Sequence, residues 1–273
     1  AGFGTPRESM RLVRTPADDG TPVIRLITNK SGLDVTRPLE RLAARRVAEL
    51  AGADLSGYVL KKDSPSCGMA RVKVYHQTGA PERTGRGLFA ARLMERLPDL
   101  PVEEEGRLSD AALRENFVER VFAYRRLRTL FEGRWRAKDV VAFHTAHKLV
   151  LMAHSPVAYR ALGQLVARVT SMPAAALRRE YSTSFMAALT VLATRRKHTN
   201  VLQHMAGYLT KTLDGDSRAE LADTIERYRQ GLVPLVVPMT LLRHHVRRAR
   251  VDYLAGQTYL EPHPAELMLR NHV

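Results

Sequence analysis

The sequence contains almost no cysteine, because Cys67 is the only one among its 273 residues. A single thiol excludes a disulfide framework within the chain. It also excludes a metal site built from several cysteines of this chain alone. A role for Cys67 in metal binding would therefore need ligands that these residues do not supply.

Long hydrophobic runs are missing as well. No apolar run approaches the roughly 18 residues of a membrane span, and the first residues lack the basic-then-apolar pattern of a signal peptide. We therefore expect a cytoplasmic protein that does not enter a membrane. An apolar content of 45% with 26% charged residues is typical of a folded chain with a sizeable core, and the length allows two domains.

Acidic residues are outnumbered by basic ones, 28 against 43, which gives a formal net charge of +15. This excess exceeds what solubility requires and has the sign that attracts phosphate polymers. Both halves of the chain are basic. Nucleic acid is therefore the partner that the composition favours.

The first part of the chain alternates strand and helix signals. Strands are predicted at residues 22–28, 57–61 and 70–75, and helices at residues 37–50 and 87–97. This order predicts an α/β layered domain over residues 1–102 with a mostly parallel sheet. In such sheets ligands bind beyond the carboxyl ends of the strands, and Cys67 follows one of those ends.

The second part of the chain is helical by pattern. Residues 98–110 contain two prolines and an acidic cluster, and they are expected to form a linker that ends at Asp110, a candidate helix N-cap. Six or seven helices and no strand are expected after it. We therefore predict an α+β multidomain protein, with an all-α domain over residues 103–273.

The segment "KKDSPSCG", residues 61–68, reads as a tight turn. Pro65 fixes the backbone and Gly68 permits a close approach, so Ser64, Ser66 and Cys67 are expected to point into a cleft where backbone amides hold an anion or a cluster. Two other interpretations stay open. Cys67 is either a buried structural residue or a nucleophile, for which His76 is the nearest base along the chain.

Four stretches of the chain carry a family resemblance: "GTPRESMRLV", "LKKDSPSCGMARVKVY", "TGRGLFAARLMERLP" and "LPVEEEGRLSDAALRENFVERVFAY". Together they resemble the TudS-type thiouracil desulfidases. The stretch "VVAFHTAHKLVLMAHSPVAYRALGQLVA" is similar to the YbgA-type helical domain. The resemblance covers essentially the whole chain.

The resemblance implies an iron–sulfur desulfidase that converts 4-thiouridine in tRNA to uridine. In this family three cysteines hold a 4Fe–4S cluster, and its fourth iron is left open to take sulfur from a thiocarbonyl. The family pattern places one cluster ligand at Cys67 and a catalytic serine at Ser64. It also implies that tRNA, rather than DNA, is the partner of the helical domain.

The chain departs from the family pattern at its beginning. The other two cluster cysteines and a catalytic carboxylate belong to family motifs, an "SSC"-like strand end and a "CPE" segment, that these 273 residues do not contain. The chain opens just after the expected position of "CPE". We expect an N-terminally incomplete desulfidase domain, and the alternative is a protein that has lost the cluster. With one thiolate, the chain by itself is expected to be inactive.

Further candidate residues lie outside the cysteine turn. In "TPRES", residues 5–9, Arg7 and Glu8 are candidates for substrate binding together with Ser66, the alternative being a surface ion pair of Arg7 with Glu8. Basic clusters with interleaved aromatic residues are candidates for RNA binding. These are Arg125, Arg126, Arg128, Arg134, Arg136, Lys138, Arg195, Arg196, Lys197, Arg243, Arg247, Arg248 and Arg250.

Three histidines, His144, His147 and His154, share one predicted helix face. A metal site is conceivable, but interhelical hydrogen bonding or contact with RNA is the favoured interpretation. His244 and His245 are expected to add to the basic surface.

Two function classes stay open beside the tRNA desulfidase: a desulfidase of free thiouracil-like bases and a non-catalytic RNA-binding protein. A thiol redox sensor at Cys67 is a weaker third possibility.

Overall fold

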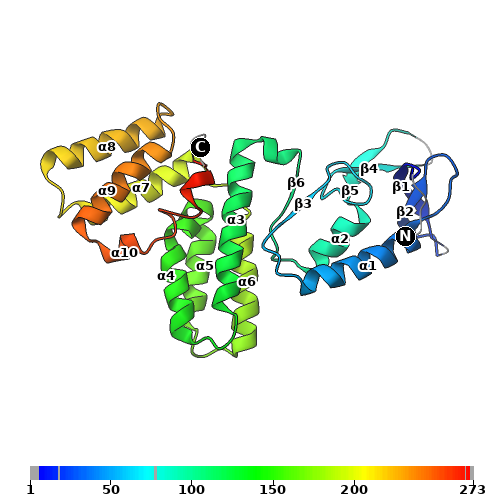
Figure 1. Cartoon of the computed structure of the whole chain (residues 1–273), viewed down its shortest axis with the longest axis horizontal. Helices are drawn as coiled ribbons and strands as arrows, with labels where there is room; N and C mark the ends of the chain where they lie inside the picture. Colours follow the sequence, from blue (N-terminus) through cyan, green and yellow to red (C-terminus); the bar gives the residue numbers. More distant parts are fainter. Residues whose placement is uncertain (1–5, 18, 77–78, 268, 271–273) are drawn as a thin grey trace. The chain divides into compact units, whose positions relative to one another are not determined.

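The computed structural model describes residues 6–17, 19–76, 79–267 and 269–270. The chain divides into two compact units, Ala1–Ser109 and Asp110–Val273 (Figure 1). Strands occur in the first unit, and the described part of the second unit is helical. The predicted α+β multidomain class is therefore confirmed.

The first unit contains a four-stranded sheet in the order β2-β1-β4-β5. Its strands are β1 (Met10–Pro16), β2 (Pro22–Thr28), β4 (Val72–Tyr75) and β5 (Glu82–Gly85). Strand β1 pairs antiparallel with β2 and parallel with β4, and β4 pairs antiparallel with β5. The prediction of a mostly parallel sheet is therefore wrong. The reason is a hairpin, since the short connection between β1 and β2 can only return the chain antiparallel to itself.

A second, parallel strand pair joins β3 (Tyr58–Leu60) to β6 (Val102–Glu104). Strand β6 lies inside the segment that we predicted to be a linker, so that prediction is wrong for these residues. The strand escaped detection because it carries two glutamates, yet Val102, Glu103 and Glu104 are all buried. A 3-10 turn at Arg107–Ser109 ends the unit.

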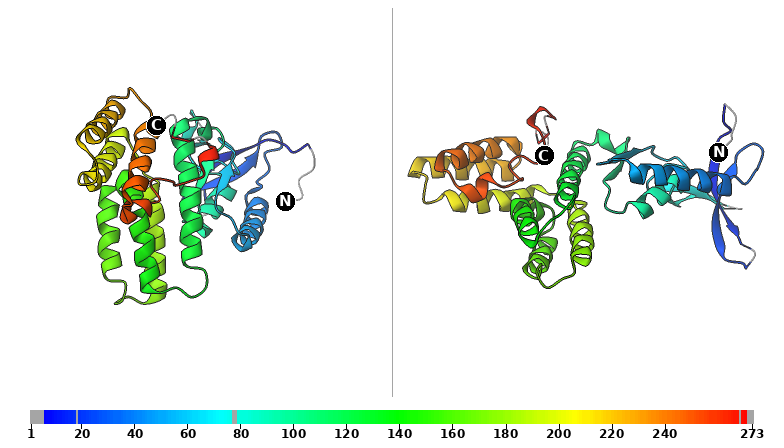
Figure 2. Two further views of the ribbon diagram at one scale, coloured as in Figure 1. Left: turned by 60° about the vertical axis from the view of Figure 1, so that its left-hand side comes forward. Right: turned by 60° about the horizontal axis from the view of Figure 1, so that its bottom comes forward.

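Two helices pack side by side against the sheet, α1 (Thr36–Gly52) and α2 (Leu88–Arg96) (Figures 1 and 2). Leu39 of α1 joins the core formed by Leu12, Leu26, Val72 and Val74 of the strands. The apolar spacing of "RPLERLAARRVAEL" predicted this buried face, which is what an amphipathic surface helix requires.

The second unit contains seven helices of twelve residues or more and one short helix in its described part. Helices α3, α4, α5 and α6 lie side by side, and α7, α8 and α9 form a second group that contacts α4 (Figures 1 and 2). None of these helices, nor those of the first unit as described, is both long and apolar enough to cross a bilayer. The bounds are α3 (Ala111–Leu130), α4 (Ala137–His154), α5 (Pro156–Ala167), α6 (Ala174–Leu189), α7 (Arg195–Leu209), α8 (Gly215–Arg229), α9 (Val236–Ala249) and α10 (Asp252–Ala255), followed by a 3-10 turn at Ala265–Leu267.

Polar caps set the start of several helices. Asp110 accepts a hydrogen bond from the Leu113 N–H at 2.9 Å, which confirms the predicted N-cap of α3. Ser155, Thr194 and Asp214 cap α5, α7 and α8 in the same way. One apolar core, which includes Tyr181, Phe185 and Leu202, unites the helices.

Candidate functional site

The turn that carries Cys67 follows strand β3 and is organised by Ser64. The Ser64 Oγ accepts hydrogen bonds from the backbone N–H groups of Ser66 at 3.3 Å and of Cys67 at 3.2 Å. The Ser64 carbonyl oxygen accepts from the Gly68 N–H at 2.8 Å. A serine that bonds the amides ahead of it closes a tight turn, so the predicted turn is confirmed.

Four consecutive backbone amides of this turn, those of residues 66–69, are occupied by the protein's own oxygens. Besides the three amides that Ser64 satisfies, the Met69 N–H donates to Glu104 Oε1 at 2.8 Å. The amides of residues 66–69 are therefore not free to hold the predicted anion or cluster.

The turn is fastened to the N-terminus of helix α2. The Phe89 N–H donates to the Ser66 carbonyl oxygen at 2.9 Å, and the Gly87 N–H donates to the Gly68 carbonyl oxygen at 2.8 Å. A Cβ atom at Gly87 would lie 2.4 Å from the Ser66 carbonyl carbon and 2.5 Å from the Cys67 nitrogen. Glycine is thus required here for close approach of two backbones.

Glu104 is a site residue that the sequence analysis missed. Its side chain comes from strand β6, is 4% exposed, and reaches the Met69 amide across 35 residues of chain. The sequence signal was misleading, because three consecutive glutamates usually indicate a solvated segment. Only the pairing of β6 with β3 brings this carboxylate to the turn.

Two hydroxyl groups lie next to the thiol. The Ser66 Oγ is 3.4 Å from Cys67 Sγ and 3.1 Å from Ser64 Oγ. Because Ser64 Oγ already accepts from two amides, its own proton is available to Ser66, and the Ser66 proton is available to the sulfur. The structure therefore brings together three predicted site residues, Ser64, Ser66 and Cys67.

The remaining candidates of the first unit have other neighbours. His76, the base considered for a nucleophilic thiol, places Nε2 3.4 Å from Glu82 Oε1. Glu8 accepts hydrogen bonds from Ser31 N–H and Oγ, both at 2.8 Å, and also contacts the Lys30 N–H. The Ser31 amide is the main cause that lowers the pKa of Glu8. Arg7 is exposed, and Thr5 lies outside the described residues.

The predicted RNA-binding residues of the second unit differ in exposure. Arg125, Arg126 and Arg128 on α3 are only partly exposed. Lys197 donates its Nζ protons to the carbonyl oxygens of His154 at 2.7 Å and Leu192 at 3.2 Å, so it joins the end of α4 to the segment between α6 and α7. The exposed members are Arg134, Arg136, Lys138, Arg195, Arg196, Arg247, Arg248 and Arg250, while Arg243 is half-buried.

The three histidines of α4 are buried and hydrogen-bonded, and the predicted interhelical bonding holds for His144 and His154 but not for His147, which bonds within its own helix. His144 Nδ1 lies 3.2 Å from the Tyr181 hydroxyl, and His147 Nδ1 donates to the Phe143 carbonyl oxygen at 2.7 Å. No group of three His, Cys, Asp or Glu side chains placed to hold a metal ion occurs in the described parts of the chain. His245 is also buried, so the expectation that it adds to the basic surface is wrong.

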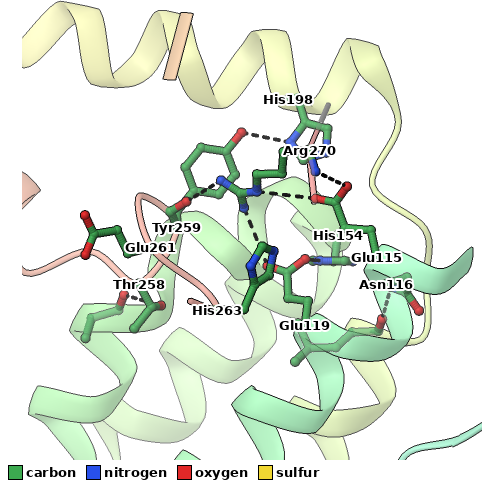
Figure 3. Close-up of polar contacts among 12 residues, drawn as sticks. Glu115, Asn116, Glu119, His154, His198, Thr258, Tyr259, Glu261, His263 and Arg270 are labelled. Atoms are coloured by element: carbon green, nitrogen blue, oxygen red, sulfur yellow. Dashed lines mark hydrogen bonds and ion pairs between the residues drawn. The ribbon is translucent and has the colours of Figure 1, made fainter. Parts of the chain in front are cut away.

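His154 belongs to a buried ionic cluster between α3, α7 and the C-terminal segment (Figure 3). Its Nδ1 lies 2.6 Å from the Val191 carbonyl oxygen and its Nε2 lies 3.2 Å from Glu119 Oε2. Each ring nitrogen therefore faces an oxygen atom, one of a backbone carbonyl and one of a carboxylate. The neighbouring positive charges of His154 and Arg270 outweigh burial and lower the pKa of Glu119 to about 2.

Arg270 closes this cluster from the C-terminal segment. Its Nη1 donates to the Tyr259 carbonyl oxygen at 2.7 Å, and its Nε lies 3.3 Å from Glu115 Oε1. Burial nevertheless raises the pKa of Glu115 to about 6. The cluster, which the sequence analysis did not predict, joins α3 to residues near the end of the chain.

Comparison with known proteins agrees with the division of the chain into two units. Residues 1–105 match the family described as 2-thiouracil desulfurase, and residues 148–264 match a family described as a protein of unknown function, DUF1722. No solved structure matches the chain significantly.

Two curated relatives cover the two units. The uncharacterized protein YbgA of Escherichia coli strain K12 is 33% identical over 156 residues, which are 56% of this chain and 90% of YbgA. The uncharacterized protein YbbK of Bacillus subtilis strain 168 is 34% identical over 95 residues, which are 34% of this chain; the chain spans 62% of the length of YbbK. The chain therefore belongs to the family of YbgA, and its residues 1–105 are similar to the 2-thiouracil desulfurases.

Proposed function

We propose that the protein acts in the desulfurization of thiolated tRNA, removing sulfur from 4-thiouridine, and that its helical unit binds the tRNA. The observation that carries the proposal is the fusion, in one chain, of a 2-thiouracil desulfurase domain with a basic helical unit. A desulfurase for free bases needs no polymer-binding surface. An enzyme for tRNA needs one, because phosphate contacts supply affinity and position the strand.

A 4Fe–4S cluster, which the resemblance implies, fits these residues only in part. Three thiolates are needed, and Cys67 is the one thiol of the sequence. Cys67 is suited to be one ligand, since its turn is fixed by Ser64, Glu104 and the start of α2. The residues present do not hold a cluster by themselves, so we assign roles only to side chains of this chain.

We assign proton handling near the reacting sulfur to Ser64 and Ser66. Their hydroxyl groups form a short chain that ends at Cys67 Sγ. Such a chain can pass a proton toward a sulfur leaving a thiocarbonyl, which is general acid catalysis by a positioned hydroxyl. The target base has to leave its stack to reach a turn of this kind.

A second candidate function is favoured by one specific observation. With a single cysteine and no metal-holding group in the described regions, these 273 residues are also consistent with a non-catalytic RNA-binding protein. The two functions differ in what they predict for iron. A desulfurase gains a brown chromophore on anaerobic iron–sulfur reconstitution of the full-length gene product, and a binding protein stays colourless.

The experiment that tests the proposal combines this reconstitution with tRNA. Full-length protein is incubated with tRNA that contains 4-thiouridine and, separately, with free thiouracil, and the loss of thiocarbonyl absorbance is followed. The proposal expects turnover of the tRNA that falls steeply with salt. Turnover of thiouracil alone would support a free-base desulfurase instead.

A further inference from the structure

A cavity of about 420 Å³ lies between helices α4 and α5 of the helical unit. Its lining includes His144, Lys148, Tyr159, Arg160, Gly163 and Gln164. Two of these side chains are cations and none is a carboxylate. No hydrogen bond or ion pair to Lys148 or Arg160 is found within the described regions of the chain.

The floor of this cavity contains an unpartnered nitrogen. His144 is 3% exposed, and its Nε2 has no hydrogen-bond partner among the described residues. A buried nitrogen without a partner is costly in a folded protein and is usually explained by a ligand or an ordered water.

The other ring nitrogen of His144 has a hydrogen-bond partner. Nδ1 lies 3.2 Å from the hydroxyl of Tyr181, which is completely buried. Burial raises the pKa of this phenol and lowers the pKa of His144 to about 4, so both groups are neutral near pH 7. The Tyr181 hydroxyl can donate to Nδ1 or accept from it, and the first arrangement, with the ring proton on Nε2, is the one that an anionic ligand in the cavity requires.

Gly163 keeps the space in front of this nitrogen open. A Cβ atom at Gly163 would lie 4.0 Å from His144 Nε2 and would meet no other atom within 4 Å. Glycine in the middle of a helix lowers helix propensity, so its presence in α5 is explained better by access to the ring than by stability.

Tyr159, which lines the cavity, is close enough to the Tyr253 phenol to influence its pKa. Burial is the main cause that raises the pKa of the Tyr253 phenol to about 12, and the neighbouring Tyr208 and Tyr159 contribute to this rise. The rings of Tyr208 and Tyr253 lie 5.0 Å apart, and Tyr208 is 46% exposed. Exposed rings beside cations are suited to stack on unpaired bases.

We propose that the α4–α5 cavity binds a phosphate group of an RNA strand, with His144 Nε2–H, Lys148 and Arg160 as donors and Tyr208 as a stacking surface for a neighbouring base. This inference rests on the proposed tRNA binding and deepens it, because none of these residues belongs to the predicted basic clusters. Charge-assisted hydrogen bonds from two cations and a neutral donor suit a phosphate oxygen.

The test uses the 273-residue chain, inorganic phosphate and unmodified tRNA. Phosphate is titrated while the ring nitrogens of the histidines are followed by ¹⁵N NMR, and tRNA affinity is measured by fluorescence anisotropy at several salt concentrations. The variants are Gly163→Ala, Lys148→Met and Arg160→Met. Arg227→Met, an exposed cation on α8 that does not line the cavity, is the matched control.

The expected result has three parts. Phosphate shifts the His144 Nε2 resonance in the wild type and not in Gly163→Ala, whose thermal stability is maintained. For Lys148→Met and Arg160→Met, the slope of the logarithm of the tRNA association constant against the logarithm of the salt concentration becomes less negative by about 1. Gly163→Ala weakens tRNA binding about threefold to tenfold, the size of one lost hydrogen bond. Arg227→Met leaves both the phosphate-induced shift of His144 and the tRNA affinity unchanged.

Two results would overturn the inference, and they are distinguishable. If wild-type protein binds tRNA but the three cavity variants behave like Arg227→Met, the cavity is not a phosphate site and the RNA-binding proposal stands. If the wild type binds no tRNA, both proposals fail, however inorganic phosphate behaves.

Discussion

Glu104 accepts a hydrogen bond from the backbone N–H of Met69 at 2.8 Å, and so connects strand β6 to the turn that carries Cys67. The carboxylate is buried, and Met69 is two residues from the thiol. The position of Cys67 thus depends on a residue 37 positions later in the sequence.

Replacement of Glu104 by alanine is expected to loosen the Cys67 turn. The Met69 amide would lose its partner, which costs about 1–3 kcal/mol of unfolding free energy. Glu104→Gln keeps an acceptor oxygen and should lose less. Urea unfolding and the rate of Cys67 modification by a disulfide reagent measure the two effects. Glu95→Ala, on the exposed side of α2, is the control. Equal thiol reactivity in all three variants would refute this role of Glu104.

Gly87→Ala should displace the same turn from the other side. The added methyl group would lie 2.4–2.5 Å from backbone atoms of Ser66 and Cys67, which cannot move as a side chain can. We expect a destabilisation on the order of 1–3 kcal/mol or more, as for overpacking in a core. Gly52→Ala, where nothing lies within 4 Å, is expected to be neutral in thermal unfolding. Similar melting temperatures of the two variants would show that the close approach is not required.

Two adjacent basic residues of α7 should behave differently. Lys197→Met removes both hydrogen bonds to the His154 and Leu192 carbonyl oxygens and should lower the unfolding free energy by about 1–3 kcal/mol. Arg196→Met, at an exposed position, should leave stability within about 0.5 kcal/mol and reduce the salt slope of tRNA binding by about 1. If Lys197→Met instead changed tRNA affinity and left stability unchanged, the structural role of the Lys197 hydrogen bonds would be contradicted.

The helical unit should lose stability between about pH 6.5 and pH 4. Burial lowers the pKa of His144 and His147 to about 4 and that of His198 to about 3. A histidine with a lowered pKa in the folded state stabilises the fold above its unfolded pKa, and this contribution is lost as the pH falls. Each ring adds about 1.4 kcal/mol per pH unit to the slope within that window.

The variant His198→Asn tests this pH dependence. It removes one titrating ring, so the number of protons taken up on unfolding, which sets the slope of the unfolding free energy against pH, should decrease by about one. The exposed His204→Asn on the same helix is the control. Glu115 acts in the opposite direction. Because its pKa is raised to about 6, its contribution to the free energy of unfolding decreases as the pH rises. A slope unchanged by His198→Asn would contradict the assignment of a buried neutral ring.

Sequence patterns predicted the parts of the fold that depend on local periodicity. The apolar spacing of α1, the Asp110 cap and the turn at Ser64 are properties of neighbouring residues, and all three are found in the structure. Strand β6 was missed because its burial depends on pairing with β3, which no local pattern of glutamates reveals.

The site was predictable only where it is local. Ser64, Ser66 and Cys67 are brought together by one turn, whereas Glu104 and Gly87 reach it through tertiary contacts. The buried ionic cluster depends even more on tertiary contacts, since Glu115 and Arg270 are 155 residues apart in the chain. Charge patterns likewise predicted a basic surface but gave no indication that the Lys197 ammonium group binds two backbone carbonyl oxygens, at the end of α4 and in the segment after α6.

The central claim, that the Cys67 turn belongs to a desulfurase acting on tRNA, is tested most directly by sulfur release. Full-length protein reconstituted with iron and sulfide is given tRNA containing 4-thiouridine, and uridine is quantified in the digested product. We predict conversion by the wild type, none by Cys67→Ala and a large decrease for Ser64→Ala with tRNA affinity unchanged in both. Equal uridine yields from the wild type and Cys67→Ala would contradict the account.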